Sequence, residues 1–471
     1  MAWIKWPRKV HRYSAEFKLK AVKNSRGLSL PRLLAYVGLC LGAVVLAVAV
    51  LILLFGGAIL NGYGKRKMER AFAEALPRHA LRIGELGYTV GPNRLVAQTV
   101  TLSAANSTLK VGPISLTGVR WARLLWGKAA LADVLANASL DATNLVMEFP
   151  QSHYGIRCAR VRASVPESEM IAEGAELRPV VGDEELFAAD AFRTTRFRVV
   201  VPECRVSGLA FGELLKGKAY RARSVHLSRA SFDILVDRYK PVGPFVKPPL
   251  MVHEALAAIR RPLQVDSLSV TDANLRYCER VVAGADPGVL TFAAVNVAAE
   301  GIGNRGDASG VILLQAQGNL MNAGVLKVQM AIPVMSPDFS LHYSGSLSPM
   351  DLTRLDAFLD IAEHTRIKSG SAKEVAFEID VTGGHARGSV RAIYTDLKIA
   401  FLDKQTGTEK GWDNRAATFL ANAFKIRNSN PLDASGSMKE GEVNYTRRPE
   451  DTFLQFAWFA LRSGVLDVIS Q

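Results

Sequence analysis

The sequence predicts a mainly β protein with an N-terminal transmembrane helix, a few peripheral helices and a curved, repeated antiparallel sheet that forms a groove. Three observations support this prediction. Residues 33–64 contain no charged side chain. From about residue 81 onward, short segments rich in Val, Leu, Ile, Thr and Phe alternate with polar residues. One strand pattern also recurs along the chain. A β-sandwich is the alternative, because alternation along a strand does not show what covers the apolar face.

The uncharged stretch predicts a transmembrane helix over residues 33–60. A helix that crosses a bilayer needs about 20 apolar residues at 1.5 Å per residue, and this stretch exceeds that length. A cleaved signal peptide has an apolar region of only about 7–15 residues with a small-residue cleavage site behind it. We therefore expect a retained single-span anchor, followed by a juxtamembrane helix over residues 61–80.

The charge distribution predicts the orientation of this anchor. Residues 1–32 carry nine Lys and Arg side chains and one acid, Glu16, so this tail supplies +8 of the formal net charge of +14. Lys65, Arg66, Lys67 and Arg70 follow the span. The excess on the N-terminal side favours a cytoplasmic N-terminus and an exported bulk of the chain. The tail would rest against anionic lipid headgroups, and we expect no nucleic-acid groove in the large exported part.

Strand-like sequence dominates the part of the chain that we expect to be exported. We expect β repeats over residues 81–245, a second β region over 246–405, and a closing segment of helix and strand over 406–471. Period-two alternation bounded by Gly, Asn, Asp and Pro is typical of strands and turns. The clearest strand segments are residues 94–104, 196–208, 224–236, 263–277, 324–334, 374–384 and 388–401.

A repeat of the form apolar-x-apolar-x-x-apolar-x-apolar-x-apolar occurs three times. The x-x step moves the apolar phase by one residue, and a shift of one in a period-two pattern requires a bulge or a break between strands. The three copies are Leu140, Ala142, Leu145, Met147 and Phe149; Val225, Leu227, Ala230, Phe232 and Ile234; and Leu268, Val270, Ala273, Leu275 and Tyr277.

Helical segments are few. We expect them over approximately residues 183–193, 249–260, 349–364, 411–426 and 450–469. The last is strongly apolar, but Arg462 and Gly464 interrupt it. We therefore expect a packed or amphipathic closing helix there and not a second membrane span.

No motif for catalysis, a metal or a cofactor is present in the sequence. The eight His residues are scattered and form no HExxH motif. Gly301–Gly306 is glycine-rich, but it lies between strand-like segments and reads as a turn. Cys158, Cys204 and Cys278 show no C-x-x-C spacing, so we expect burial as small hydrophobic side chains. Whether any two of them pair is left open. We expect a protein that is not an enzyme and has no cofactor.

Residues 12–22 resemble the opening of the helix-turn-helix segment of insertion-sequence transposases. The similarity covers about 20 residues, and the membrane span begins where a recognition helix would follow. A basic segment lying on the membrane face is the favoured interpretation. A membrane-tethered DNA-binding regulator remains an alternative that depends on residues 12–32.

The chain as a whole resembles the AsmA-like proteins of Gram-negative envelopes. The similarity rests on the N-terminal span, the repeated strand units, and the echo of LLWGKA at 124–129 in LLKGKA at 214–219. Residues 245–400 resemble the AsmA-related domain of unknown function, and NAFKIRNSNP with the segment after it resembles the end of that group. The resemblance implies an inner-membrane-anchored, periplasmic, β-rich protein connected with outer-membrane biogenesis. Larger TamB-like relatives carry phospholipid along a curved sheet.

Lipid is therefore the expected partner, bound or transferred along the apolar face of the sheet. Each acyl CH₂ group buried contributes about 0.8 kcal/mol, so even a loose groove would hold a tail. A non-catalytic scaffold that binds other envelope proteins is the runner-up function, and no nucleic acid is expected. The residues predicted to face lipid are Leu140, Leu145, Met147, Val225, Leu227, Phe232, Leu268, Val270, Leu275 and Tyr277. Ordinary core packing is the alternative role of these side chains.

Overall fold

The computed structural model describes residues 79–89, 91–104, 106–120, 131–243, 249–305, 310–403, 426–431 and 438–470, with a few helical positions between 65 and 73. The predicted basic tail, the transmembrane span at 33–60 and most of the helix expected at 411–426 lie outside the described residues. Within the described ranges, no helix has the length and apolar character needed to cross a membrane.

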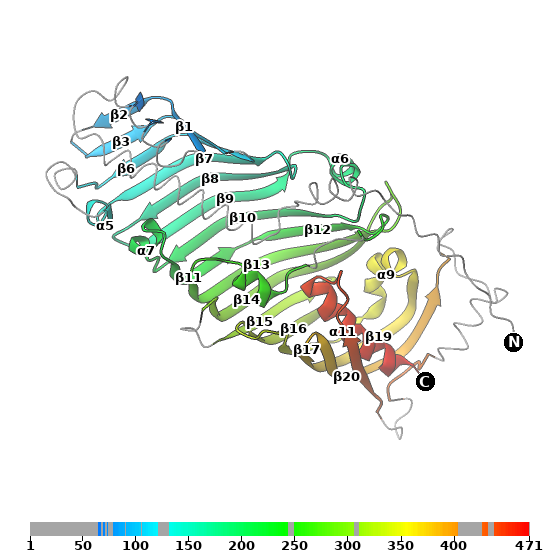
Figure 1. Cartoon of the computed structure of the whole chain (residues 1–471). Helices are drawn as coiled ribbons and strands as arrows, with labels where there is room; N and C mark the ends of the chain where they lie inside the picture. Colours follow the sequence, from blue (N-terminus) through cyan, green and yellow to red (C-terminus); the bar gives the residue numbers. More distant parts are fainter. Residues whose placement is uncertain are drawn as a thin grey trace, which may run out of the picture.

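The described strands join into one long, curved sheet, shown in Figure 1. The order along the sheet follows the order along the chain almost throughout, because most neighbours are joined as hairpins. The first half contains β7 (Ser139–Phe149), β8 (Tyr154–Ser164), β9 (Glu169–Pro179), β10 (Thr195–Ser207), β11 (Tyr220–Ser228) and β12 (Ser231–Asp237). The second half contains β13 (Leu263–Arg280), β14 (Gly288–Gly303), β15 (Val311–Leu320), β16 (Gly324–Pro333), β17 (Leu341–Leu347), β18 (Met350–Asp351), β19 (Thr365–Thr382), β20 (His385–Phe401) and β21 (Glu440–Thr446).

Short strands extend the sheet beyond β7 at its N-terminal end. These strands are β1 (His79–Ile83), β2 (Leu86–Thr89), β3 (Arg94–Ala97), β4 (Val100–Ala104), β5 (Ser107–Val111) and β6 (Ile114–Thr117). β5 and β6 lie end to end along the same edge of β7, and they pair with its second and first halves respectively. β4 pairs with both β1 and β5, while β3 pairs with both β2 and β6. Beyond β7 the sheet therefore continues as three further lines, and each line consists of two short strands that lie end to end.

The sheet is mixed, and the prediction of a purely antiparallel sheet was wrong at one place. β11 and β12 follow one another along the same line, and both run parallel to β13. The chain leaves the end of β12 and returns to the start of β13 through the segment that contains α8 (Val252–Ala257). A parallel pair needs such a crossover connection in place of a tight hairpin.

A line of residues with positive φ crosses the sheet at the level of the x-x step in the sequence repeat. The second x residue has a positive φ in all three copies, with 53° at Asn144, 52° at Arg229 and 53° at Asp272. Gly174 on β9, with φ 63°, and Ala294 on β14, with φ 49°, continue the line. The residue with positive φ shifts the side-chain alternation by one position and so restores the apolar phase. At Asp272 the pairing of β13 with β14 shifts in register, as at a β-bulge. Arg229 lies at the break between β11 and β12, and β7 keeps a constant register with β8 through Asn144. The expected bulge or break is confirmed in the second and third copies of the repeat, while β7 stays continuous and in register at Asn144.

These positive-φ positions keep the apolar side chains on one face of the sheet. Residues that pair directly across strands point to the same face. One such row runs from β7 to β19 through Leu140, Ala163, Met170, Val206, Val225, Leu268, Ala299, Leu314, Met330, Tyr343 and Ile379. A second row contains Ala142, Val161, Ala172, Cys204, Leu227, Val270, Val297, Ala316 and Val328. We call this surface the apolar face.

Helices lie at the rims and over the C-terminal half. The expected helices at 183–193 and 249–260 appear as α6 (Asp183–Ala188) and α8. The segment at 349–364 contains η2 (Leu352–Leu355) and α9 (Asp356–Ala362), and the closing segment forms α11 (Phe453–Ile469). α9 packs on β13, β14 and β19, and α11 packs on β20 and β21. Two short helices, α5 (Leu131–Val134) and α7 (Phe211–Leu215), were not predicted.

α11 also closes the last edge of the sheet. The backbone N–H of Glu442 on β21 donates to Asp467 at 2.8 Å, and that of Asn444 donates to the hydroxyl of Ser463 at 3.1 Å. Both acceptors are side chains of α11. Unpaired edge groups are a template for adding a further strand, and here two of them are already satisfied within the chain.

Candidate functional site

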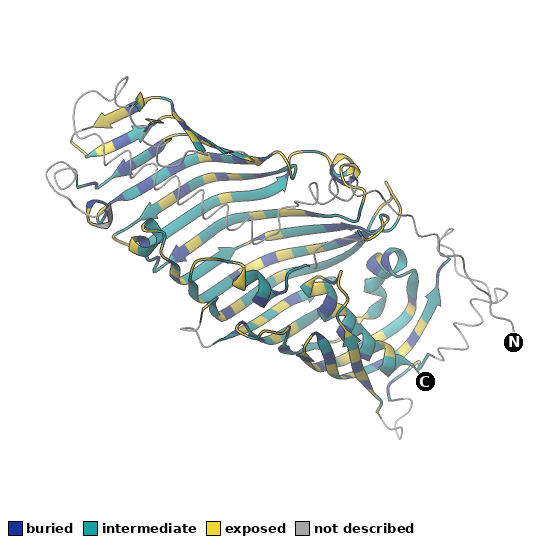
Figure 2. Cartoon of the chain, in the orientation of Figure 1, coloured by how far each residue is buried: buried dark blue, intermediate teal, exposed yellow. Residues whose placement is uncertain are grey.

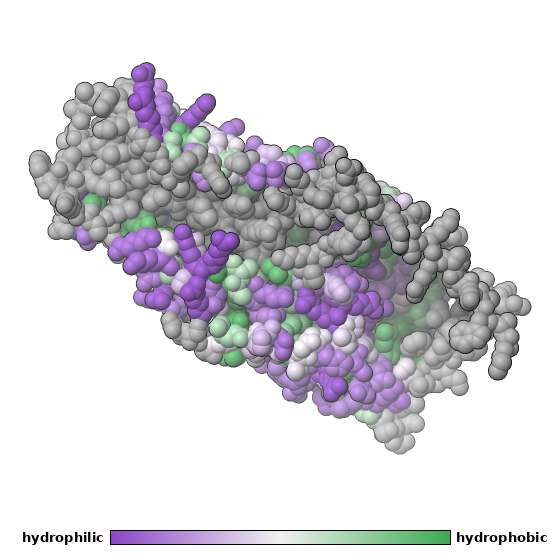
Figure 3. All heavy atoms as spheres, viewed as in Figure 1, coloured by the Kyte–Doolittle hydropathy of each residue, from purple (hydrophilic) through white to green (hydrophobic). Residues whose placement is uncertain are grey.

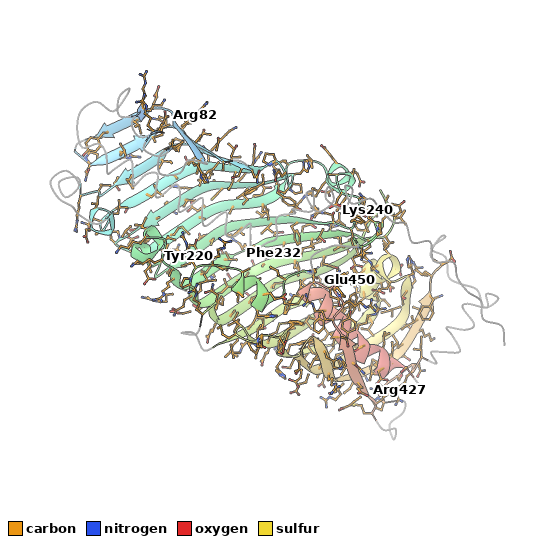
Figure 4. The ribbon with its side chains drawn as sticks, viewed as in Figure 1. Arg82, Tyr220, Phe232, Lys240, Arg427 and Glu450 are labelled. Carbon is orange, nitrogen blue, oxygen red and sulfur yellow. The ribbon has the colours of Figure 1, made fainter. Side chains whose placement is uncertain are left out.

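All of the predicted lipid-facing residues lie on the apolar face. Phe232 on β12 pairs with Leu275 on β13, and Ile234 pairs with Tyr277 in the same register. Figure 4 shows Phe232 in the middle of the sheet, between Tyr220 at one rim and Lys240 at the other. The three copies of the repeat therefore form parts of one continuous surface.

The predicted residues differ in how far they are buried. Leu140, Leu145, Met147 and Val270 are buried. Val225, Leu227, Phe232, Leu268, Leu275 and Tyr277 are only partly buried. Partly buried residues dominate the middle strands in Figure 2, while buried residues concentrate toward both ends of the sheet. The middle of the apolar face thus combines apolar character with accessibility.

A cluster around Ala230, Val270 and Ala273 shows what surrounds these side chains. Its other members are Val201, Leu227, Phe232, Val295 and Val297, and all of them belong to or adjoin strands β10 to β14. No described helix contributes a residue to this cluster. Neighbours within one sheet cover the flanks of a side chain and leave its tip uncovered.

Phe197 on β10 extends the accessible surface toward the rim at α6. It pairs with Ile234, so its ring belongs to the apolar face, and it is 37% exposed. Sequence reasoning missed Phe197, although the alternation of Phe197, Val199 and Val201 within the predicted strand at 196–208 would have identified it.

The C-terminal half of the apolar face is covered by its own helices. Tyr343 donates a hydrogen bond to the backbone oxygen of Ala457 on α11 at 3.1 Å. Burial of Tyr343 raises the pKa of its phenol above the usual range. Arg462 of α11 forms an ion pair with Glu363 at 3.0 Å, just beyond the end of α9. In Figure 3, apolar residues lie set back beside the polar outer surface of this half.

The opposite face of the sheet is polar. Arg205 on β10 pairs with Glu169 on β9 at 2.9 Å, and Arg391 on β20 pairs with Glu374 on β19 at 2.7 Å. Such exposed pairs each contribute about 0–1 kcal/mol. Their main consequence is a charged, solvated outer surface. The exception on this face is a small buried cluster of Phe187, Leu235, Cys278 and Val289 beside α6.

Buried charges mark the rim beside α6. Arg280 at the end of β13 is 5% exposed and Asp237 at the end of β12 is 2% exposed, and the two form an ion pair at 3.4 Å. Arg196 is 2% exposed and pairs with Asp233 at 3.1 Å. These groups are mutually paired, as buried charges must be, so they hold the rim together.

A small pocket lies at the opposite rim. His253, Asp338, Phe339, Gly384 and Arg447 are among its lining residues, and its volume is about 280 Å³. The His253 ring stacks on Phe339 with 5.9 Å between centroids. Burial lowers the pKa of His253. The lining combines both signs of charge and contains no nucleophile set beside a base.

The three described cysteines occur as free thiols. Cys158 and Cys278 are buried and Cys204 is partly buried. Burial raises the pKa of all three thiols, to about 11 at Cys278. The described residues contain no group of three or more His, Cys, Asp or Glu side chains that would hold a metal ion.

Comparison with known proteins gives no identification. The sequence matches no protein-family model and no curated protein. The class established by the structure is therefore a mainly β protein built on one large, mixed and curved sheet.

Proposed function

We propose that this chain is a membrane-anchored protein that binds lipid acyl chains on the apolar face and transfers them along it. The observation that carries the proposal is the continuous set of apolar rows, whose middle part is partly exposed. A soluble partner surface of this size would carry polar groups among its apolar ones. Here the rows contain almost only Ala, Val, Leu, Ile, Met and Phe.

The energetics favour a flexible apolar ligand. An acyl chain adapts to an uneven surface, and each CH₂ removed from water contributes about 0.8 kcal/mol. About eight such groups would supply roughly 6 kcal/mol before the cost of ordering the chain. Within one row, the apolar side chains of adjacent strands lie about 4.8 Å apart, so an acyl chain can pass from one strand to the next without crossing a polar barrier.

The resemblance to AsmA-like proteins supports the wider setting of the proposal. In that setting, the chain is held in the bacterial inner membrane with a cytoplasmic N-terminus and a periplasmic sheet, and it supports outer-membrane biogenesis. The uncharged stretch at 33–60 and the basic tail before it are the sequence features on which this placement rests.

Photo-cross-linking of the full chain tests the proposal. A photoreactive amino acid at Phe232 should label co-purifying lipid, because this side chain belongs to the apolar face. The matched control is Ser231, which is adjacent on β12, exposed and on the opposite face. Lipid adducts at both positions, or at neither, would refute binding on the apolar face.

A pair of substitutions separates lipid binding from core packing. Phe232→Asp should abolish co-purified lipid while the protein stays folded, and Ser231→Asp should leave the lipid content unchanged. If Phe232→Asp instead unfolds the chain, the side chain is part of an ordinary core. Protein adducts without lipid adducts at Phe232 would favour the scaffold function.

A further inference from the structure

Arg193 and Arg238 lie at the rim of the apolar face beside α6. Arg193 precedes β10 by two residues, and its backbone N–H donates to Pro241 at 2.9 Å, which extends the pairing of β10 with the end of β12. By alternation, Arg193 lies on the side of Phe197, and Arg238 lies on the side of Phe232 and Ile234. Both side chains therefore belong to the apolar face.

The two arginines differ in how they are paired. Arg238 forms an ion pair with Glu279 and also donates to the backbone oxygen of Ala362 at 3.1 Å. The Nε of Arg193 is buried and has no hydrogen-bond partner among the described residues. No ion pair to its guanidinium is found in the described part of the chain either. A half-buried cation without a partner is costly, and this cost is removed when an anion binds.

The electrostatic surroundings agree with this geometry. Burial lowers the pKa of Arg193, and the positive charge of Arg238 lowers it further. The negative charges of Glu279 and Glu450 raise the pKa of Arg193 and so oppose this shift. Glu279 is already paired with Arg238, and Glu450 is exposed ahead of α11. Figure 4 shows Lys240 and Glu450 near this corner. The Nζ of Lys240 donates to the backbone oxygens of Phe187 and Asp190, so this lysine stabilises the end of α6 and the loop after it.

We propose that Arg193 and Arg238 bind the phosphate group of a lipid whose acyl chain lies on the apolar face beside Phe197. This inference rests on the proposed function and names the headgroup chemistry. Arginine presents planar donors that match two phosphate oxygens. Arg193 precedes Phe197 by four positions, a distance of about 13 Å along an extended chain. This places a phosphate at the rim and the tail on the sheet.

The test uses the full chain with photoactivatable lipids. A phosphatidylglycerol and a diacylglycerol with identical diazirine-bearing acyl chains are offered in separate reactions, and the labelled protein is quantified by mass spectrometry. Wild type should label about tenfold more with the phospholipid, the ratio expected for one charge-assisted hydrogen bond. Arg193→Gln should remove this preference while diacylglycerol labelling persists. Glu450→Gln, which removes an opposing negative charge, should increase the preference.

The matched control is Arg198→Gln. Arg198 lies on β10 and forms an ion pair with Asp183 at 2.8 Å, so its loss should leave the preference unchanged. Equal labelling by both lipids in wild type, or a preference that survives Arg193→Gln, would overturn the phosphate site and leave acyl binding intact. Failure of both lipids to label would refute the proposed function itself. If glycerol 3-phosphate protects as well as the intact lipid, the site takes free phosphate esters and the lipid assignment is wrong.

Discussion

Gly441 on β21 and Gly464 on α11 are in direct contact. A Cβ atom at Gly441 would lie 2.0 Å from the backbone oxygen of Gly464. A Cβ atom at Gly464 would in turn lie 2.6 Å from Val390 and 2.7 Å from Val443. The absence of side chains at these two positions is what allows α11 to approach the last strands so closely.

Gly441→Ala should therefore destabilise the protein by about 1–3 kcal/mol, the usual cost of overpacking. Thermal unfolding of the full chain in detergent measures this effect. A Cβ atom at Gly212 in α7 would meet no other atom within 4 Å, so Gly212→Ala serves as the control. It should match wild type or be slightly more stable, because alanine restricts the unfolded chain. Equal melting temperatures for both variants would contradict the close contact.

The positive φ at the break between β11 and β12 makes a prediction at Arg229. Its φ is 52° and its side chain is exposed, so a substitution there tests the backbone with little loss of packing. Arg229→Val should destabilise the fold by about 1–3 kcal/mol, because a β-branched residue tolerates this conformation poorly. Arg229→Gly should be neutral or stabilising. Denaturant unfolding of the two variants compares their stability, and equal stability would show that the backbone at this break relaxes freely.

The buried ion pair at the rim makes a third prediction. Asp237→Leu leaves Arg280 buried without one of its two carboxylate partners and should cost about 3–5 kcal/mol. The double variant Asp237→Leu with Arg280→Met should recover most of that loss. Glu184→Gln, which removes the exposed partner of Arg280, should change stability by at most about 1 kcal/mol. A double variant less stable than Asp237→Leu alone would mean that the pair itself stabilises the rim.

His253 predicts a pH dependence of stability. Burial lowers its pKa below the ordinary value of 6.5, and Arg447 also lowers it, while Glu254 and Asp338 raise it. The unfolded chain therefore takes up a proton more readily than the folded one. The stabilising contribution is complete above pH 6.5 and is lost as the pH falls through the folded pKa. Melting temperatures at pH 7.5 and pH 5.5 should differ less in His253→Gln than in wild type, and an unchanged difference would exclude His253 as the cause.

Local patterns were enough to predict much of this fold. The alternation in 196–208 and 263–277 identified strands, because period two is a property of the single strand. The x-x step in the repeat predicted a bulge or a break between strands, which are found at Asp272 and Arg229, and Asn144 shares their positive φ. The apolar face followed from the same repeat, since each copy contains the side chains on one side of its strand.

The remaining features depend on contacts between distant parts of the chain. The parallel pairing of β12 with β13 depends on where the segment between them returns, which no period in the sequence records. Phe211 anchors the short helix α7, but a helix of five residues is too short to leave a periodic signal. The sequence does not distinguish Arg193 from the many surface arginines, because its position beside Arg238 depends on the contact between β10 and the end of β12.

Two backbone N–H groups on the outer edge of β21, those of Glu442 and Asn444, donate hydrogen bonds to the side chains of Asp467 and Ser463. These two groups cannot pair with a strand from a second copy of this chain unless α11 detaches from them. A partner that binds at this edge would therefore contact the sheet through side chains of α11 and not through these two backbone groups.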